Sequence, residues 1–335
     1  MKKILNEPGA YVDEMLEGLC LAHPESYRQL GPEGRVLARA DGPIKGKVGI
    51  ASGGGSGHLP VFTGYVGEGL LDSCAIGDVF SSPGVEQVAE AIRAANGGAG
   101  VLRLYGNYGG DKMNFDMAGE MVEMEDIPTT SVRVADDVAS APFAEREKRR
   151  GVAGLVYAYK LAGAKADQLC SLEEVTALAQ KAADACRSIG VALTSCTVPA
   201  AGRPTFEIGE SEMEIGMGIH GEPGVRHGTL KPADEIAEEM LGYLLADMPL
   251  EGGDRISVLV NSLGATPPEE LYIVYRYVAR KLAGLGVEIV MPLVGRYATS
   301  MEMAGMSLTF CKLDEELEAL LKAPCNCPYL KVSRS

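Results

Sequence analysis

The chain is poor in aromatic residues and in histidine. Its 335 residues include no tryptophan, six phenylalanines and four histidines. It also lacks long hydrophobic runs, because no stretch approaches the ~18 apolar residues of a membrane helix and residues 6–9 interrupt the apolar start before it reaches signal-peptide length. We therefore expect no membrane association and a cytoplasmic location.

Positive charge is scarce as well. Lys and Arg number 31 against 46 Asp and Glu, which gives a net charge of −15. Nucleic-acid binding depends on clustered Lys and Arg that neutralise phosphates, so no nucleic-acid partner is expected. Hydrophobic residues make up 46% of the chain and there are 42 glycines, a composition typical of a packed globular protein with many tight turns.

The cysteines do not suggest a metal site or a disulfide framework. All eight are scattered along a chain without secretion signals, which favours reduced, mostly buried thiols. The one close pair, Cys325 and Cys327, has no further ligands at suitable spacing. No zinc or other metal is predicted.

The length favours two domains, since a single hydrophobic core usually stops growing at about 250–300 residues. Apolar runs that end in glycine or polar loops alternate with helix-length segments, a pattern that predicts an α/β fold. We predict two α/β domains with mixed or mostly parallel sheets flanked by helices, an N-terminal one over residues 1–185 with glycine-rich substrate loops and a C-terminal one over residues 186–335.

In the first predicted domain, strands are expected over residues 48–51, 101–104 and 131–134, each followed by a glycine-rich or acidic loop. Ligands in such folds bind at the carboxyl ends of the strands, so these three loops are the first place to look for a site.

In the second part, residues 172–188 predict a helix and residues 190–199 a strand. Met213, Ile215, Met217 and Ile219 alternate with polar residues or glycine, which predicts a half-buried strand that ends at His220. Further strands are expected over 256–260 and 287–292, and helices over 267–282 and 314–321.

Residues 53–58 read Gly-Gly-Gly-Ser-Gly-His. Glycines at this density let the backbone approach a small, oxygen-rich ligand and present N–H groups to it. A phosphate-binding P-loop would need Lys and then Ser or Thr after the last glycine, and a dinucleotide fingerprint a further glycine, so both nucleotide interpretations fail at His58, Leu59 and Pro60. A merely tight turn remains an alternative.

Residues 106–111 follow the next strand and end in Asp111. Asp111 could cap the helix that starts beside it, or it could act as a general base toward a substrate hydroxyl. The sequence leaves both roles open.

His220 stands among glycines and turn-forming residues. A single histidine is more often structural than catalytic, yet two of the four histidines, His58 and His220, follow strands in glycine-rich segments. A neutral imidazole can add to an electrophilic carbonyl. His23 and His227 have no comparable setting and receive no role.

Together these motifs resemble the substrate-binding subunit of the dihydroxyacetone kinase family, from about Glu7 to the C-terminus. The matching segments are 53–58, 77–83, Asn107-Tyr108, Gly110-Asp111, 113–115, 151–154, 216–224 and 261–264.

The resemblance implies that His220 forms a hemiaminal with the ketone carbon of dihydroxyacetone, which selects carbonyl compounds over glycerol. It implies that Asp111 and His58 assist bond formation and activate the hydroxyl that receives phosphate. The backbone of Gly55, Ser56 and Gly57 would hold substrate oxygens, and Gly106 would lie beside the ketose.

The resemblance also implies partners. No nucleotide or magnesium motif is recognisable here, and phosphoryl transfer needs charge neutralisation, so no cofactor is expected in this chain. ADP or ATP with magnesium is expected on a separate nucleotide-binding kinase subunit, with either phosphoenolpyruvate or free ATP as the source of phosphate. At 335 residues the fused form of the family is not expected, and a homodimer is.

Two departures from the family pattern affect the substrate. The family often has lysine where Gly106 stands and glutamate where Leu59 stands. A roomier pocket and a longer ketose such as erythrulose form one hypothesis. Another is a ketose-sensing coactivator without kinase activity, against which the presence of both Asp111 and His58 speaks.

Overall fold

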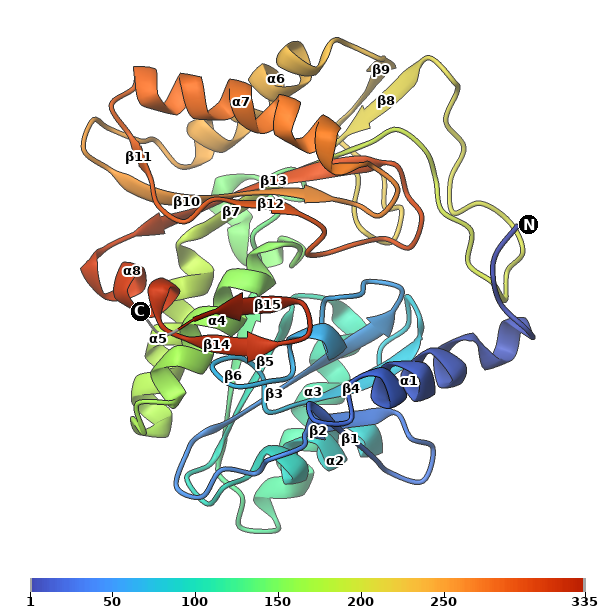
Figure 1. Ribbon diagram of the computed structural model, residues 1–335, viewed down its shortest axis with the longest axis vertical. Helices are drawn as coiled ribbons and strands as arrows, with labels where there is room; N and C mark the ends of the chain where they lie inside the picture. The colour runs from blue at the N-terminus through green and yellow to red at the C-terminus, as the bar shows by residue number, and fades with distance from the viewer. Residues whose placement is uncertain (1, 334–335) are drawn as a thin grey trace.

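The computed structural model describes residues 2–333, and its first half is built on a six-stranded sheet (Figure 1). The strand order is β1-β2-β4-β3-β5-β6, with β3 parallel to β4 and β5, β5 parallel to β6, and β1 and β2 antiparallel to their neighbours. The strands are β1 (Tyr27–Leu30), β2 (Val36–Arg39), β3 (Gly49–Ser56), β4 (Ser73–Val79), β5 (Val101–Gly106) and β6 (Thr129–Val134).

Helices cover both faces of this sheet. On one face, α2 (Val85–Ala95) and α3 (Gly109–Glu123) share an apolar cluster with the strands. On the other face lie α1 (Tyr11–Ala22), α4 (Gly154–Ala166) and α5 (Leu172–Asp184). Both faces of the parallel strands are therefore buried, as apolar strand sequences require.

The second half is built on a seven-stranded mixed sheet. Its order is β11-β10-β13-β7-β8-β9, with β12 also paired to β10. The strands are β7 (Cys186–Ala192), β8 (Glu212–Ile215), β9 (Arg226–Thr229), β10 (Arg255–Ser262), β11 (Glu288–Ile289), β12 (Leu293–Gly295) and β13 (Gly305–Leu313). The helices α6 (Ala233–Asp247) and α7 (Pro268–Gly284) pack on its outer face (Figure 1).

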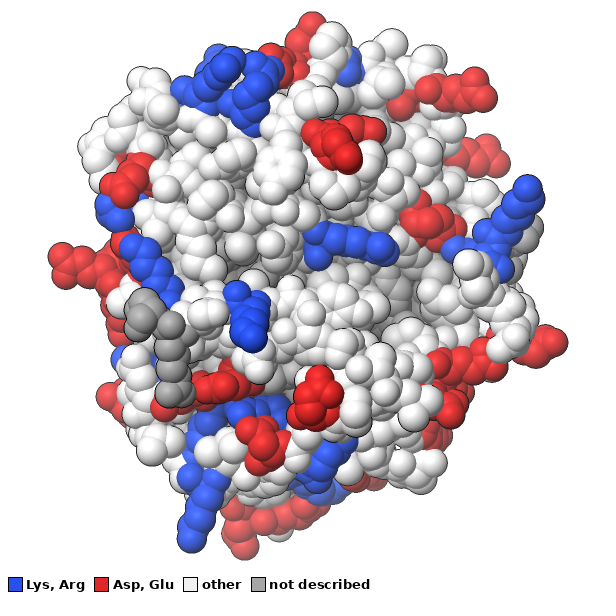
Figure 2. Space-filling model, viewed as in Figure 1, with Lys and Arg blue, Asp and Glu red and all other residues white. Residues whose placement is uncertain are grey.

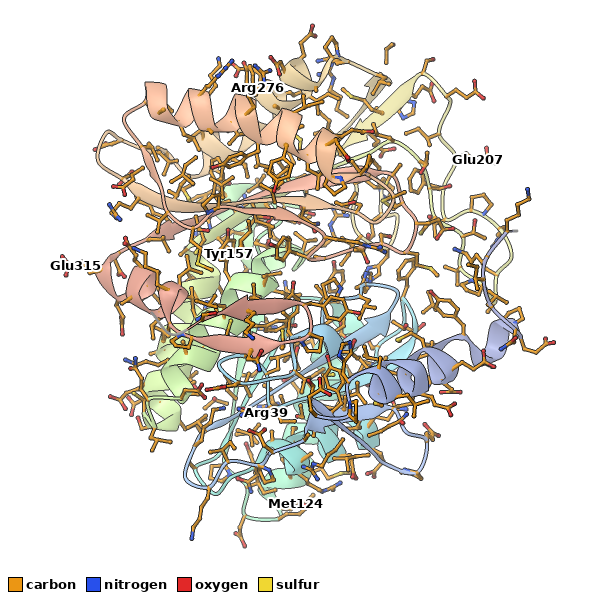
Figure 3. All side chains as sticks on the ribbon, viewed as in Figure 1. Arg39, Met124, Tyr157, Glu207, Arg276 and Glu315 are labelled. Atoms are coloured by element: carbon orange, nitrogen blue, oxygen red, sulfur yellow. The ribbon has the colours of Figure 1, made fainter. Side chains whose placement is uncertain are left out.

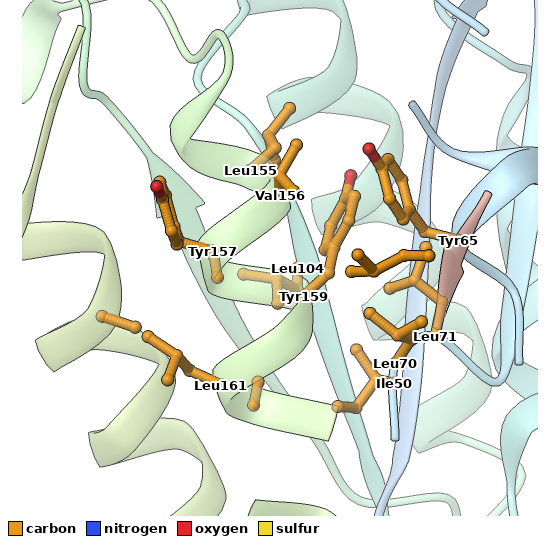
Figure 4. Packing of buried hydrophobic residues seen from close by; sticks show 14 of the residues in the cluster. Ile50, Tyr65, Leu70, Leu71, Leu104, Leu155, Val156, Tyr157, Tyr159 and Leu161 are labelled. Carbon is orange, nitrogen blue, oxygen red and sulfur yellow. The ribbon is translucent and has the colours of Figure 1, made fainter. Parts of the chain in front are cut away.

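Helix α4 joins the two halves. Its residues are almost all buried, and Figure 4 shows Tyr157 and Tyr159 pointing from it in different directions within the apolar cluster. The hydroxyl of Tyr157 is 2.9 Å from Oγ of Ser257 on β10, and that of Tyr159 is 2.8 Å from Oγ of Ser52 on β3. Tyr157 accordingly lies near the middle of the molecule in Figure 3.

The chain then returns to the first half. After α8 (Glu315–Lys322), the hairpin of β14 (Cys325–Cys327) and β15 (Leu330–Val332) packs with the first apolar cluster, and Asn326 pairs with Glu68. The strands of the first sheet precede residue 185 and those of the second sheet follow it, but this C-terminal segment packs on the first half of the molecule. The predicted division into residues 1–185 and 186–335 stays a prediction.

The glycine-rich segment is not the loop that the sequence predicts. Strand β3 continues through it to Ser56, paired with β4. A Cβ atom on Gly53 would lie 2.4 Å from the carbonyl oxygen of Ala75, and one on Gly54 would lie 2.2 Å from Cζ of Phe62. These glycines therefore allow close packing inside a sheet.

The strand expected to end at His220 is also shorter than predicted. Strand β8 ends at Ile215, and Gly216 turns the chain with φ of 82°. Met217 and Ile219 remain buried in a small cluster with Met301. The alternation of apolar residues thus continues past the end of β8 because the loop that follows the strand is itself packed in the interior.

Three other predicted boundaries are displaced. The helix predicted to reach residue 188 ends at Asp184, and the strand that follows begins at Cys186. Of the strand expected over 287–292 only β11 (Glu288–Ile289) forms, and β12 begins at Leu293, beyond the predicted end. Local propensity is a weak guide to where an element ends, because tertiary context often overrides it.

None of the helices within residues 2–333 is both long enough and apolar enough to cross a membrane. On the face shown in Figure 2, Lys and Arg side chains stand among Asp and Glu and do not form one broad basic patch. All eight cysteines lack a disulfide partner, and Cys325 and Cys327 are buried in the terminal hairpin.

Candidate active site

Four aromatic rings meet where strands of the first sheet end beneath the loop that follows β8. The ring of His58, just after β3, has its centroid 4.9 Å from that of His220. Phe80, after β4, stacks on His58 at 4.9 Å, and Tyr108, after β5, lies 4.8 Å from His220. The carboxyl ends of adjacent strands thus assemble the site together with the second half of the molecule.

Glu222 holds His220 at two points. The Nδ1 atom of His220 is 2.9 Å from Oε1 of Glu222, and the backbone N–H of His220 donates to Oε2 at 2.9 Å. Burial alone would raise the pKa of Glu222, but the bond to His220 and its charge lower the pKa to about 2. A carboxylate therefore accepts the Nδ1 proton, which leaves Nε2 of His220 as the free nitrogen.

Arg150 contacts the turn that carries His220 and Glu222. Its Nε donates to Asp137 at 2.9 Å and its Nη2 donates to the carbonyl of Gly216 at 2.9 Å, while Nη1 is 3.9 Å from Glu222. Arg150 thereby links the segment after β6 to the loop that carries His220.

His58 is almost fully buried, with 2% of its surface exposed. Its Nδ1 is 2.7 Å from the carbonyl oxygen of Thr299, whereas its Nε2 is buried without a partner. Because burial and the neighbouring His220 lower the pKa of His58 to about 3, the ring is neutral at physiological pH. The carbonyl of Thr299 can only accept, so Nδ1 carries the proton and Nε2 is a hydrogen-bond acceptor.

Asp111 lies in the first turn of α3, but Tyr108 occupies the N-cap position. The interpretation of Asp111 as the helix cap is therefore wrong. Its Oδ1 atom is buried without a partner. Burial raises the pKa of Asp111 to about 6, although a hydrogen bond with Ser82 and the charge of His220 act in the opposite direction.

The glycine positions are tightly packed. A Cβ atom on Gly55 would lie 2.6 Å from the nitrogen of Ser81. The carbonyl of Ser56 accepts from the N–H of Phe80, and the carbonyl of Gly57 accepts from that of Met301. The role of residues 55–57 in holding substrate oxygens stays a prediction, since these contacts explain the glycines by packing.

Gly106 ends β5 directly beside Tyr108. A Cβ atom there would lie 3.2 Å from Cε2 of the Tyr108 ring. The Tyr108 ring thus borders residue 106, and the expectations that Gly106 enlarges the pocket and lies beside the ketose stay predictions. Leu59, by contrast, lines a cavity of about 290 Å³ together with Ser56 and Gly57.

The structure thus brings the rings of His58 and His220 together and puts Asp111 within reach of the charge of His220, whereas His23 and His227 lie elsewhere. The catalytic roles of the three residues stay predictions. Sequence reasoning assigned no role to Glu222 or Tyr108, although both lie inside the quoted motifs. No local sequence pattern pointed to Arg150, because the residues that it contacts belong to other segments of the chain.

Three of the four buried side-chain polar atoms without a partner in residues 2–333 belong to this site: His58 Nε2, Asp111 Oδ1 and the Tyr108 hydroxyl. Buried polar groups are normally paired, so unpaired ones around one histidine indicate a site for a small polar ligand. Among the same residues, no group of three or more His, Cys, Asp or Glu side chains is placed to hold a metal ion.

Comparison with known proteins gives a consistent result. The Dak1 domain model matches residues 17–329. The chain is 43% identical to the dihydroxyacetone-binding subunit DhaK of PTS-dependent dihydroxyacetone kinase 2 from Listeria innocua, over 99% of this chain and 100% of that protein. It is also 43% identical to an L-erythrulose kinase of Pectobacterium atrosepticum, but over 56% of that longer protein.

Two solved structures are similar. The dihydroxyacetone kinase of C. freundii superposes with a TM-score of 0.88 at 32% identity, over 99% of this chain and 60% of that one. The dihydroxyacetone kinase operon co-activator Dha-DhaQ gives 0.87 at 33% identity, over 93% and 96%.

Proposed function

Because the chain belongs to the Dak1 family, that of the dihydroxyacetone-binding subunits of dihydroxyacetone kinases, we propose that it holds a short hydroxyketone covalently on His220. It presents one hydroxyl of that ketone to a phosphoryl donor on a separate nucleotide-binding subunit. The observation that carries the proposal is the free Nε2 of His220 beside two unpaired buried groups, on His58 and Asp111.

In the first step, Nε2 of His220 attacks the ketone carbon. A C–N bond forms, the carbonyl oxygen gains negative charge and the imidazole gains positive charge. Glu222, 2.9 Å from Nδ1, stabilises the positive ring. Asp111, with a pKa of about 6, is partly protonated near neutral pH and can give its proton to the oxygen.

In the second step, Asp111 as a carboxylate accepts the proton of the hydroxyl that attacks the phosphoryl group. The acceptor Nε2 of neutral His58 orients a hydroxyl of the adduct by hydrogen bonding. We place the nucleotide and its magnesium on the partner subunit, where they supply the phosphoryl group and neutralise its charge.

The test is carbon NMR of dihydroxyacetone labelled at its carbonyl carbon. We expect a tetrahedral-carbon signal with the wild-type protein and none with His220→Ala. The matched control is His227→Ala, since His227 lies on the exposed strand β9 and pairs with Glu212. A wild-type protein that gives no such signal with dihydroxyacetone or with erythrulose would remove the mechanism.

A longer ketose is a second candidate substrate. The cavity beside Leu59 adjoins Ser56 and Gly57, where the predicted oxygen-binding backbone lies, and some relatives are named erythrulose kinases. We would abandon erythrulose if the complex with its partner turned over dihydroxyacetone with a far higher kcat/KM.

A ketose-sensing coactivator is the third candidate, because a co-activator shares the fold. Addition of the nucleotide-binding subunit separates it from the kinase: phosphorylated ketose supports the kinase, and bound but unphosphorylated ketose supports the sensor. We also propose a homodimer, which light scattering would test.

A further inference from the structure

The hydroxyl of Tyr108 has no partner although it is buried at the centre of the site. Its ring packs edge-on against His220 at 4.8 Å. Burial raises the pKa of Tyr108 well above its ordinary value, so the group is a neutral phenol that can both donate and accept a hydrogen bond.

Tyr108 and Asp111 have different surroundings. The charges that act on the Tyr108 hydroxyl are those of Glu222, Asp137, Arg150 and Asp136. Asp111 instead interacts with Ser82 and His220. The two unpaired groups therefore have different neighbours at the site.

Gly106 leaves space for this position of the ring. A Cβ atom at residue 106 would approach two carbons of the Tyr108 ring to 3.2 and 3.3 Å, closer than ordinary van der Waals contact. A side chain at residue 106 would therefore require the Tyr108 ring to give way by a few tenths of an ångström.

Three unpaired groups also match the chemistry of the ligand. A ketone attached to His220 through its carbonyl carbon presents the former carbonyl oxygen and, if it is dihydroxyacetone, one hydroxyl on each arm. Asp111 serves the arm that receives phosphate, and His58 serves another oxygen of the adduct. No side chain is assigned to the second hydroxyl. Apart from the backbone of residues 55–57, which is predicted to hold substrate oxygens, the Tyr108 hydroxyl is the remaining unpaired buried group at the site among the described residues.

We propose that Tyr108 recognises the hydroxyl on the arm that is not phosphorylated, so that the site selects ketones with a hydroxyl on both carbons beside the carbonyl. This proposal rests on the covalent role of His220. It makes Tyr108 a specificity-determining residue.

The test compares dihydroxyacetone with hydroxyacetone, which lacks the second hydroxyl, by calorimetric titration of the full chain. An unpaired buried polar group costs about 1–3 kcal/mol, so the wild-type protein should bind dihydroxyacetone roughly 5- to 150-fold more tightly. Tyr108→Phe should reduce that preference to about threefold or less, chiefly by weakening the binding of dihydroxyacetone. A preference of that size corresponds to a difference in binding free energy near the ~0.5 kcal/mol of an ordinary surface substitution.

The matched control is Tyr105→Phe. Tyr105 lies three residues away on β5, but its hydroxyl accepts from Ser131 and its ring stacks on Phe115, away from His220. This variant should keep the wild-type preference. Carbon NMR of the labelled ketones follows the adduct in each variant.

An adduct in Tyr108→Phe with an unchanged preference, or with equal weakening of both ketones, would overturn the role of Tyr108 and leave the function of His220 intact. A wild-type protein without an adduct would overturn both. Loss of the preference in Tyr108→Phe but not in Tyr105→Phe supports the proposal.

Discussion

At the scale of single residues, burial acts in opposite directions on the two groups beside His220. It lowers the pKa of His58, whose charged form is the protonated one, and raises that of Asp111, whose charged form is the ionised one. Both shifts favour neutral groups. A neutral His58 and a carboxyl that is partly protonated near neutral pH suit the addition of the His220 nitrogen to a ketone.

Asp111→Asn should stabilise the fold while it reduces kinase activity. The pKa of Asp111 rises from 3.8 to about 6 in the folded protein, so the fold carries the cost of a buried charge above that pH. Removing it should add ~1–3 kcal/mol to the free energy of unfolding at pH 8. The gain should shrink as pH falls from 6 toward 3.8, because the wild-type carboxyl becomes protonated.

Loss of the proton acceptor should lower kcat by about 10²- to 10⁴-fold. The control is Asp116→Asn on the same helix, which is half exposed and pairs with Arg103. Urea unfolding at several pH values and activity with the partner subunit measure both effects. An unstable Asp111→Asn protein would contradict the account of its pKa.

At the scale of elements, strand β3 is shaped by the absence of side chains. Gly53 packs against the carbonyl of Ala75, and Gly54 packs against the ring of Phe62, which also lies near His58. The same glycines that permit this packing deliver His58 to the end of the strand. Helix α5 contrasts with it, since the capping box of Ser171 and Glu174 specifies its start locally.

Gly54→Ala should destabilise the protein and disturb the site. Its Cβ would lie 2.2 Å from Cζ of Phe62, so that buried ring must move, at a cost of about 1–3 kcal/mol for overpacking. Gly242→Ala in α6 is the control, because nothing lies within 4 Å of the added atom and alanine favours a helix by ~0.5–1 kcal/mol. The midpoint of thermal unfolding should fall for Gly54→Ala and rise for Gly242→Ala. A Gly54→Ala protein with an unchanged midpoint would refute the packing argument.

At the scale of the whole molecule, the site depends on the placement of the two halves. His58 and Asp111 come from the first sheet and its helix, and His220 comes from the second. Buried links fix this arrangement: Tyr157 with Ser257, and the ion pair of Arg149 with Asp247 at the end of α6.

Asp247→Ala should strongly lower the free energy of unfolding. Arg149 is only 1% exposed, so loss of its partner leaves a buried charge unpaired, at a cost of about 3–5 kcal/mol. The control is Asp234→Ala, whose partner Arg276 stands on the outer helix layer (Figure 3) and whose exposed ion pair is worth ~0–1 kcal/mol. Equal urea midpoints for the two variants would show that Asp247 does not hold the halves together.

The sequence by itself determined the α/β class and the family, and it predicted His58, Asp111 and His220 as site residues. These follow from local apolar periodicity and from short motifs, which need no knowledge of distant contacts. It did not determine the course of β3 through the glycines or the end of β8 at Ile215, because packing against Ala75, Phe62 and Met301 decides both.

Only the tertiary structure decided which groups are buried and which remain unpaired. Glu222 binds its near neighbour His220, but the turn that aims them is braced by Arg150, Asp137 and Gly216 from separate segments. The unpaired Tyr108 hydroxyl likewise depends on burial by both halves. Electrostatic environment is a property of the assembled interior, and no local pattern in the chain encodes it.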